Sequence, residues 1–172
     1  VIISCRFWTL PEPTADYYTD ELLNEAKEFS DTAVIVIARV GGEGTDLPTD
    51  LGAKDEEGNN LYTYTDNSTE YSDFESGQHY LELSQTERNM VNIVCKNFDH
   101  VIVICNSSNA MELGWVDEYK QIGSVISCPG AGETGFAALG KILNGEVNPS
   151  GKLADTYVYD LTATPACNTF GD

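Results

Sequence analysis

Three short apolar runs along the chain predict buried strands. They cover residues 33–39, 101–105 and 124–128. In the first two runs, apolar residues follow one another without the polar alternation of a strand that has one face in water. Such runs are typical of parallel strands covered on both faces. We therefore expect these three segments to be the central strands of a parallel sheet.

Helical patterns lie between the predicted strands. Thr19 precedes an acidic first turn and an apolar stripe over residues 20–29, which predicts a capped helix. Ser84-Gln85-Thr86-Glu87 matches a capping box, and apolar residues follow it at helical spacing. Weaker patterns predict a helix over 134–143, a helix-like stretch at about 110–120 and an extended segment over 152–159.

The alternation of strands and helices sets the expected fold class. It favours an α/β fold, a three-layer sandwich with a mainly parallel sheet of Rossmann or flavodoxin-like architecture. We expect one such domain over residues 1–172, interrupted by a long acidic loop at 47–79. Loops of this length in compact domains are usually functional or mobile, so we expect 47–79 to be the least ordered internal segment.

Composition narrows the possible partners. The net charge of −19 and the pI near 4.1 oppose binding to nucleic acid or to an anionic membrane surface. Apolar runs stay well short of the roughly 20 residues of a membrane-spanning helix. The chain begins at Val1 and moves at once into sequence typical of ordered structure. We interpret it as a piece of a longer protein.

The cysteines and histidines give no pattern of a bridge or a metal site. The five cysteines form no C-x-x-C pair, and His79 and His100 have no potential ligand at a suitable spacing. We therefore expect free thiols, a reducing and hence cytoplasmic location, and neither a metal ion nor a cofactor. The cysteines are Cys5, Cys95, Cys105, Cys128 and Cys167.

A carboxylate follows the first predicted strand. Gly41, Gly42 and Gly44 allow a sharp turn that presents Glu43 at the carboxyl end of the strand. In open α/β sheets, ligands bind at this end. Glu43 is therefore either an acid/base group or one more solvated glutamate of an acidic loop, and the local sequence leaves both readings open.

Residues 130–135 match the dinucleotide fingerprint G-x-G-x-x-G between a predicted strand and a helix, and Asp155 follows at about the expected distance. Glu133 opposes this interpretation, because its charge would lie beside the pyrophosphate at the helix end that should attract it. The alternative is a tight turn that requires glycine.

Read together, five segments in order resemble the C-terminal α/β sandwich domain of glycoside hydrolase family 3, a group with many β-glucosidases. They are residues 32–46 (a strand, then Gly-Glu-Gly-x-Asp), 80–87 (Tyr-x-Leu-x-x-x-Glu), 101–109 with Trp115 (Val-Val-Val-x-Asn and Trp), 129–135 (Pro-Gly-Gln-x-x-Gly) and 145–153 (Gly-x-x-Asn-Pro-Ser-Gly-Lys-Leu).

The resemblance implies part of a retaining, exo-acting β-glycosidase that cleaves β-linked oligosaccharides or aryl glycosides. By position in the motif, Glu43 corresponds to the general acid/base, and Arg39 and Asp46 are expected to bind the sugar. The nucleophilic Asp is expected on a (β/α)8 barrel domain of the same parent chain, so this chain alone should be inactive. Leu47 follows Asp46 where the family often has Arg, which alters the expected sugar contacts.

Two other functions stay open at this point. The chain could be a nucleotide- or flavin-binding α/β module that uses Gly130–Gly135, or a non-catalytic sandwich domain that supports a barrel. A barrel with a catalytic Asp upstream of Val1 would favour the glycosidase over the binding module.

Overall fold

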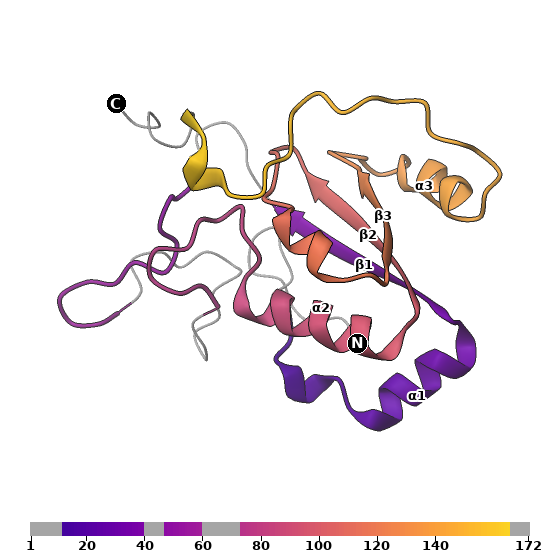
Figure 1. Ribbon diagram of the computed structural model, residues 1–172, viewed down its shortest axis with the longest axis horizontal. Coiled ribbons are helices and arrows are strands. Elements are labelled where there is room, and N and C mark those ends of the chain that lie inside the picture. The colour runs from indigo at the N-terminus through magenta and orange to yellow at the C-terminus, as the bar shows by residue number, and fades with distance from the viewer. Residues whose placement is uncertain (1–11, 40–46, 60–72, 166–172) are drawn as a thin grey trace.

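The computed structural model describes residues 12–39, 47–59 and 73–165. A parallel sheet of three strands lies at its centre, in the order β1 (Thr32–Arg39), β2 (His100–Ser107) and β3 (Ile122–Ser127) (Figure 1). β1 and β2 pair in register along their whole length, from Thr32 opposite His100 to Arg39 opposite Ser107. The predicted strands and the expected α/β fold with a parallel sheet are confirmed.

The helices begin where the caps predict. In α1 (Asp20–Phe29), the Thr19 side chain accepts a hydrogen bond from the Leu22 backbone N–H. α2 (Gln85–Asn97) begins with the predicted capping box, in which Ser84 and Glu87 bond reciprocally. α3 (Phe136–Leu143) starts two residues later than expected, and Asn144 is its C-cap. In Figure 1, α1 and α2 lie together below the sheet, while α3 lies apart from them.

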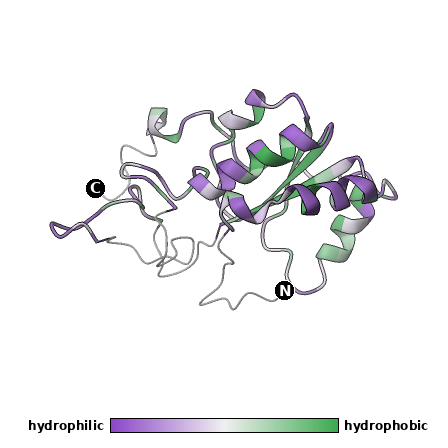
Figure 2. Cartoon of the chain, turned by 90° about the horizontal axis from the view of Figure 1, so that it is seen from below, coloured by the Kyte–Doolittle hydropathy of each residue, from purple (hydrophilic) through white to green (hydrophobic). Residues whose placement is uncertain are grey.

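The main core lies between α2 and one face of the sheet, and apolar residues gather there (Figure 2). Side chains alternate between the two faces of a strand, so every second residue of β1 and β2 points at α2. The buried residues are Ile35, Ile37, Leu83, Met90, Val91, Cys95, Phe98, Val101, Val103, Cys105, Met111 and Trp115.

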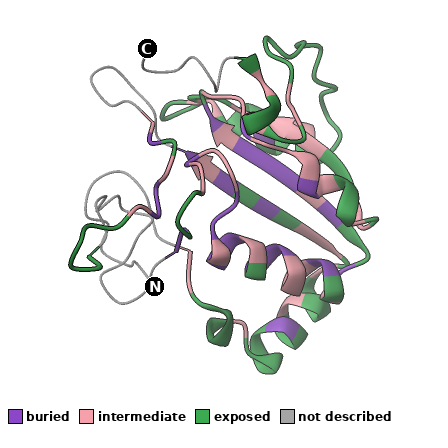
Figure 3. Ribbon diagram, turned by 60° about the vertical axis from the view of Figure 1, so that its left-hand side comes forward, coloured by how far each residue is buried: buried purple, intermediate pink, exposed green. Residues whose placement is uncertain are grey.

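The other face of β1 differs from the expectation of a strand covered on both sides. Val34 is 46% exposed and Val36 is 53% exposed, and Figure 3 shows exposed positions alternating with buried ones along this strand. β1 forms an edge of the described sheet, so its second face has fewer neighbours than that of β2. The expectation of burial on both faces was wrong for β1.

Two weaker local predictions also need correction. The helix-like stretch at 110–120 contains only a short 3-10 helix, η2 (Gly114–Glu118). A Cβ at Gly114 would lie 2.7 Å from the backbone oxygen of Tyr159, so this segment is shaped by a tertiary contact that local periodicity does not encode. Residues 152–159 form no strand, although the Leu113 N–H donates to the Val158 carbonyl.

Parts of the acidic loop expected at 47–79, which we call the acidic excursion, are packed into the structure. Leu51, Phe74 and Tyr80 are buried together in a second, smaller core. The Leu51 N–H donates to the Gln78 carbonyl at 2.8 Å, which joins the two described ends of the excursion. Residues 60–72 lie outside the described part of the chain. The expectation that 47–79 is the least ordered internal segment stays a prediction.

Three cysteines lie in the described part, and all are free thiols, as expected. Cys95 and Cys105 are buried and Cys128 is half-buried. Burial raises the pKa of the Cys105 thiol to about 11, so it is protonated at neutral pH. Within residues 12–39, 47–59 and 73–165, no helix has the length and apolar character needed to cross a membrane.

Candidate active site

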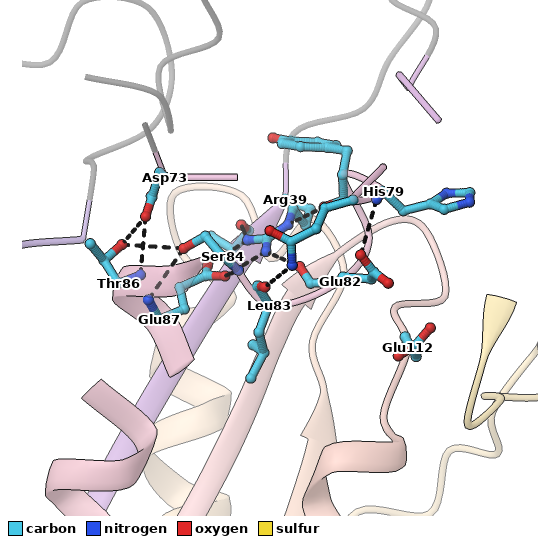
Figure 4. A network of polar contacts seen from close by, with 12 residues as sticks. Arg39, Asp73, His79, Glu82, Leu83, Ser84, Thr86, Glu87 and Glu112 are labelled. Carbon is cyan, nitrogen blue, oxygen red and sulfur yellow. Dashed lines mark hydrogen bonds and ion pairs between the residues drawn. The ribbon is translucent and has the colours of Figure 1, made fainter. Parts of the chain in front are cut away.

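Arg39 ends β1 at the carboxyl edge of the sheet, and only 4% of it is exposed. Its Nη1 and Nη2 donate to Glu87 Oε1 and Oε2, each at 2.6 Å, which makes a bidentate ion pair. The remaining three N–H groups donate to backbone carbonyls: Tyr80 and Glu82 at 2.6 Å and Ala38 at 2.7 Å. All five donors of the guanidinium are therefore engaged with protein acceptors (Figure 4).

Two aromatic rings of the smaller core flank the same guanidinium. Its central carbon lies 5.3 Å from the centroid of Tyr80 and 5.8 Å from that of Phe74. At these distances the rings attract the cation, and they also keep water from it. Arg39 thus links the end of β1 to the smaller core.

Glu87 connects this ion pair to the start of α2. Its Oε2 accepts from the Ser84 N–H at 2.9 Å, in addition to the bond from Arg39. The Ser84 hydroxyl in turn accepts from the Glu87 N–H at 3.2 Å. A single carboxylate therefore serves as both the capping-box acid and the partner of the buried cation.

Asp73 supports the same helix start from the end of the acidic excursion. One of its carboxylate oxygens accepts from the Thr86 N–H at 3.0 Å and from the Thr86 hydroxyl at 2.5 Å. Burial raises the pKa of Asp73 above its ordinary value, and the hydrogen bonds from Thr86 oppose that shift. The site therefore holds a carboxylate that is easier to protonate than one in water.

Two more carboxylates lie on the outer side of the Arg39 cluster. Glu82 accepts from the His79 N–H at 3.0 Å (Figure 4). Glu112 accepts from the Leu161 N–H at 3.0 Å. Burial raises the pKa of Glu82, and the neighbouring charge of Glu112 raises it further. The charges of His79 and Arg88 oppose this shift but do not cancel it, so Glu82 is easier to protonate than a carboxylate in water.

Of the three site residues predicted from the sequence, the structure describes one. Glu43 and Asp46 lie outside the described residues, so their roles stay predictions. Arg39 is described, and its expected contact with sugar also stays a prediction. The sequence analysis identified Ser84–Glu87 as a capping box but missed the pairing of Glu87 with Arg39. A buried arginine at a strand end needs an acid, yet Glu87 lies 48 positions further along the chain, and many other acidic residues lie between the two.

The G-x-G-x-x-G segment has a local explanation. Gly130 and Gly132 adopt φ values of 55° and 62°, which favour glycine. A Cβ at Gly135 would lie 2.2 Å from the Ala131 carbonyl oxygen. The geometry of the turn therefore accounts for all three glycines. In the described part of the chain, no group of three or more His, Cys, Asp or Glu side chains is arranged to hold a metal ion.

Comparison with known proteins identifies the family. The model of the glycosyl hydrolase family 3 C-terminal domain matches residues 16–171. The chain is 34% identical to β-glucosidase A of Butyrivibrio fibrisolvens over 160 residues, covering 88% of this chain and 18% of that protein. It is 30% identical to a β-glucosidase of Ruminococcus albus over 151 residues, covering 88% of this chain and 13% of that protein.

A solved structure agrees with this match. A β-glucosidase from Paenibacillus barengoltzii superposes with a TM-score of 0.66 at 29% identity, over 90% of this chain and 14% of that one. The chain thus spans less than a fifth of the length of these relatives. It belongs to glycosyl hydrolase family 3, and it corresponds to the C-terminal domain of that family.

Proposed function

We propose that this chain is part of a retaining, exo-acting β-glycosidase, and that Glu43 is the general acid/base of the parent enzyme. The observation that carries the proposal is the membership in family 3, together with relatives that are named β-glucosidases. In the sequence, Glu43 follows the last residue of β1 by four positions, and β1 ends at the carboxyl edge of a parallel sheet, where α/β proteins bind ligands.

The chemistry of the reaction is compatible with an active site shared between two domains. A retaining glycosidase uses two carboxyl groups about 5–5.5 Å apart, one as nucleophile and one as acid and then base. We propose that the nucleophilic Asp belongs to a (β/α)8 barrel domain of the same parent chain. The substrate is then a β-linked oligosaccharide or an aryl glycoside bound between the two domains, and this chain alone is inactive.

The electrostatics of the described edge support an acid/base there. Such a group must hold a proton near neutral pH, so its pKa must lie above the ordinary value of a glutamate. Burial and neighbouring carboxylates already raise the pKa of Glu82 and of Asp73. The same two effects would act on Glu43 once a partner domain covers it.

Of the two residues expected to bind the sugar, Arg39 and Asp46, we propose that Asp46 is the ligand. Direct contact of Arg39 with a sugar would require release of one of its five protein acceptors. Release of a contact at a buried charge is costly, because the acceptor then lacks its partner. We therefore assign sugar binding to Asp46.

The leaving-group dependence of Glu43→Gln in the intact parent enzyme tests the proposal. Glycosides with poor leaving groups need protonation, so their hydrolysis should slow about 10²- to 10⁴-fold. Activated aryl glycosides should keep much of their first-step rate. Glu56→Gln, in the exposed part of the same acidic excursion, is the matched control and should leave both rates unchanged. An equal loss on both substrate classes would show that Glu43 is not the acid.

A further inference from the structure

We infer that Arg39 is a positioning residue, which together with Glu87 fixes the end of β1 and hence the origin of the segment that carries Glu43. The inference rests on the proposed function of Glu43. It reassigns Arg39 from contact with the sugar to control of the geometry of the acid/base. The argument depends only on the contacts of described residues and on the length of chain between Arg39 and Glu43.

The first step is the saturation of the guanidinium. Two donors hold Glu87 at 2.6 Å, and three hold the carbonyls of Ala38, Tyr80 and Glu82. A planar fork with every donor engaged has one permitted orientation, because rotation about any side-chain bond breaks several contacts together. The end of β1 is therefore held more tightly than a backbone ladder alone would hold it.

The second step is the origin of the acceptors. Tyr80 and Glu82 belong to the segment that leads into α2, and Glu87 lies in the first turn of that helix. Glu87 is itself fixed by the Ser84 N–H, while Asp73 holds the neighbouring Thr86. Arg39 thus ties the strand end to a part of the molecule that is rigid for independent reasons.

The third step is the choice of a charged pair. A buried ion pair is often no more stabilising than well-packed apolar residues of similar volume, so stability alone does not require it. A bidentate pair does impose a fixed distance and a fixed plane on its partners. This property suits a support for catalytic geometry, and lysine lacks the fork needed to reproduce it.

The fourth step is proximity along the chain. Three residues, 40–42, separate Arg39 from Glu43. Four consecutive Cα–Cα steps reach at most about 14 Å when fully extended. The position of the strand end therefore limits the region that Glu43 can reach, and a misplacement of about 1 Å in an active site can cost about 10²-fold in rate.

The test compares two substrates in the intact parent enzyme that carries Arg39→Lys. The quantity measured is the ratio of kcat/KM on an activated aryl glycoside to kcat/KM on a glycoside with a poor leaving group, because kcat/KM reports the first step, in which the leaving group departs. Both rates come from one preparation, so the folded fraction cancels from the ratio. We expect Arg39→Lys to raise this ratio about 10-fold or more, because departure of a poor leaving group needs a well-placed proton donor and departure of an activated one does not. Arg88→Lys, the same change at a half-buried arginine on α2, should leave the ratio unchanged.

Two further variants separate the possible failures. Glu87→Gln should raise the ratio as Arg39→Lys does, and Arg39→Lys should raise it no further in a Glu43→Gln background. If Glu43→Gln raises the ratio but Arg39→Lys and Glu87→Gln do not, the positioning role is wrong and the acid/base assignment stands. If Glu43→Gln itself leaves the ratio unchanged, the proposed function fails, and the positioning role fails with it.

Discussion

The carboxyl ends of β1 and β3 look alike in sequence, since each strand runs into a glycine-rich turn, yet they are held in different ways. β1 ends at Arg39, whose side chain contacts acceptors from residues 80–87. β3 ends at Ser127, and the turn that follows depends on its own backbone, with Gly130 and Gly132 at positive φ. The β1 end is fixed by five contacts of a buried guanidinium. At the β3 end, Ser127 has a single side-chain hydrogen bond, to the Tyr157 hydroxyl at 3.0 Å, and the turn after it is shaped by its own backbone.

Because of this difference, we regard the β1 end, and not the β3 end, as the one that can hold a catalytic group in a fixed position. A turn shaped by glycines needs no particular side chains around it, and several of its residues are exposed. An end held by a buried ion pair and two aromatic rings is sensitive to substitutions far away in sequence. We therefore expect the largest effects of mutation at the β1 end.

Removal of the cation should have the largest effect on stability. Arg39→Met leaves the Glu87 carboxylate buried without its partner, so the free energy of unfolding should fall by about 3–5 kcal/mol. Urea-induced unfolding, monitored by circular dichroism, measures this change. The double variant Arg39→Met/Glu87→Leu should recover much of the loss, because it removes both charges together. Failure of the double variant to recover would mean that the hydrogen bonds of Arg39 to backbone carbonyls dominate.

A backbone change at the β3 end should have a smaller effect. Gly135→Ala places a Cβ 2.2 Å from the Ala131 carbonyl oxygen, so the turn must shift at a cost of about 1–3 kcal/mol. Gly140→Ala is the matched control in α3, where a Cβ meets no atom within 4 Å. It should stabilise by about 0.5–1 kcal/mol through helix propensity. Equal thermal stability of the two variants would refute the local explanation of the glycines.

The pH dependence of Asp73 should give the smallest effect. Burial raises the pKa of Asp73 in the folded state above the ordinary value of 3.8. The folded protein therefore binds a proton at this site more readily than the unfolded chain does. The contribution of Asp73 to stability is lost as the pH rises through its folded pKa, and it returns as the pH falls toward 4. Asp73→Asn cannot titrate, so wild type should gain stability relative to the variant between pH 7 and pH 4.

Unfolding of both proteins across this pH range isolates the residue, since the other carboxylates are common to both. If the difference in unfolding free energy between wild type and Asp73→Asn does not change with pH, the pKa of Asp73 is not raised. The hydrogen bonds from Thr86, which lower the pKa, would then balance the effect of burial.

The fold was predictable where local physics decides it. The apolar runs predicted the three strands, and the caps at Thr19 and Ser84 placed the starts of two helices. The prediction was wrong where a tertiary contact decides the conformation. Gly114 packs against Tyr159, and the 110–120 stretch becomes a short 3-10 helix. The spacing of apolar residues within this stretch does not depend on such a contact, so it could not predict one.

The site was less predictable than the fold. Family motifs pointed to Glu43 and to its glycines, but they gave Arg39 only a generic role in sugar binding. The pairing of Arg39 with Glu87 depends on β1 and α2 meeting in space, across 48 residues of sequence. The burial of Phe74 and Leu51 within an otherwise polar excursion has the same origin. Both features depend on contacts between residues far apart in the sequence, and the composition of a single segment does not predict such contacts.

The most direct test of the acid/base assignment is azide rescue of the Glu43→Gln parent enzyme, with the product identified by NMR. A glycosyl-enzyme that lacks its base should accumulate on an activated aryl glycoside, and azide should attack it without needing deprotonation. We predict accelerated turnover and a β-glycosyl azide, the product of net retention. No acceleration by azide, or an α-glycosyl azide formed by single displacement, would contradict the assignment of Glu43 as the acid/base of a retaining enzyme.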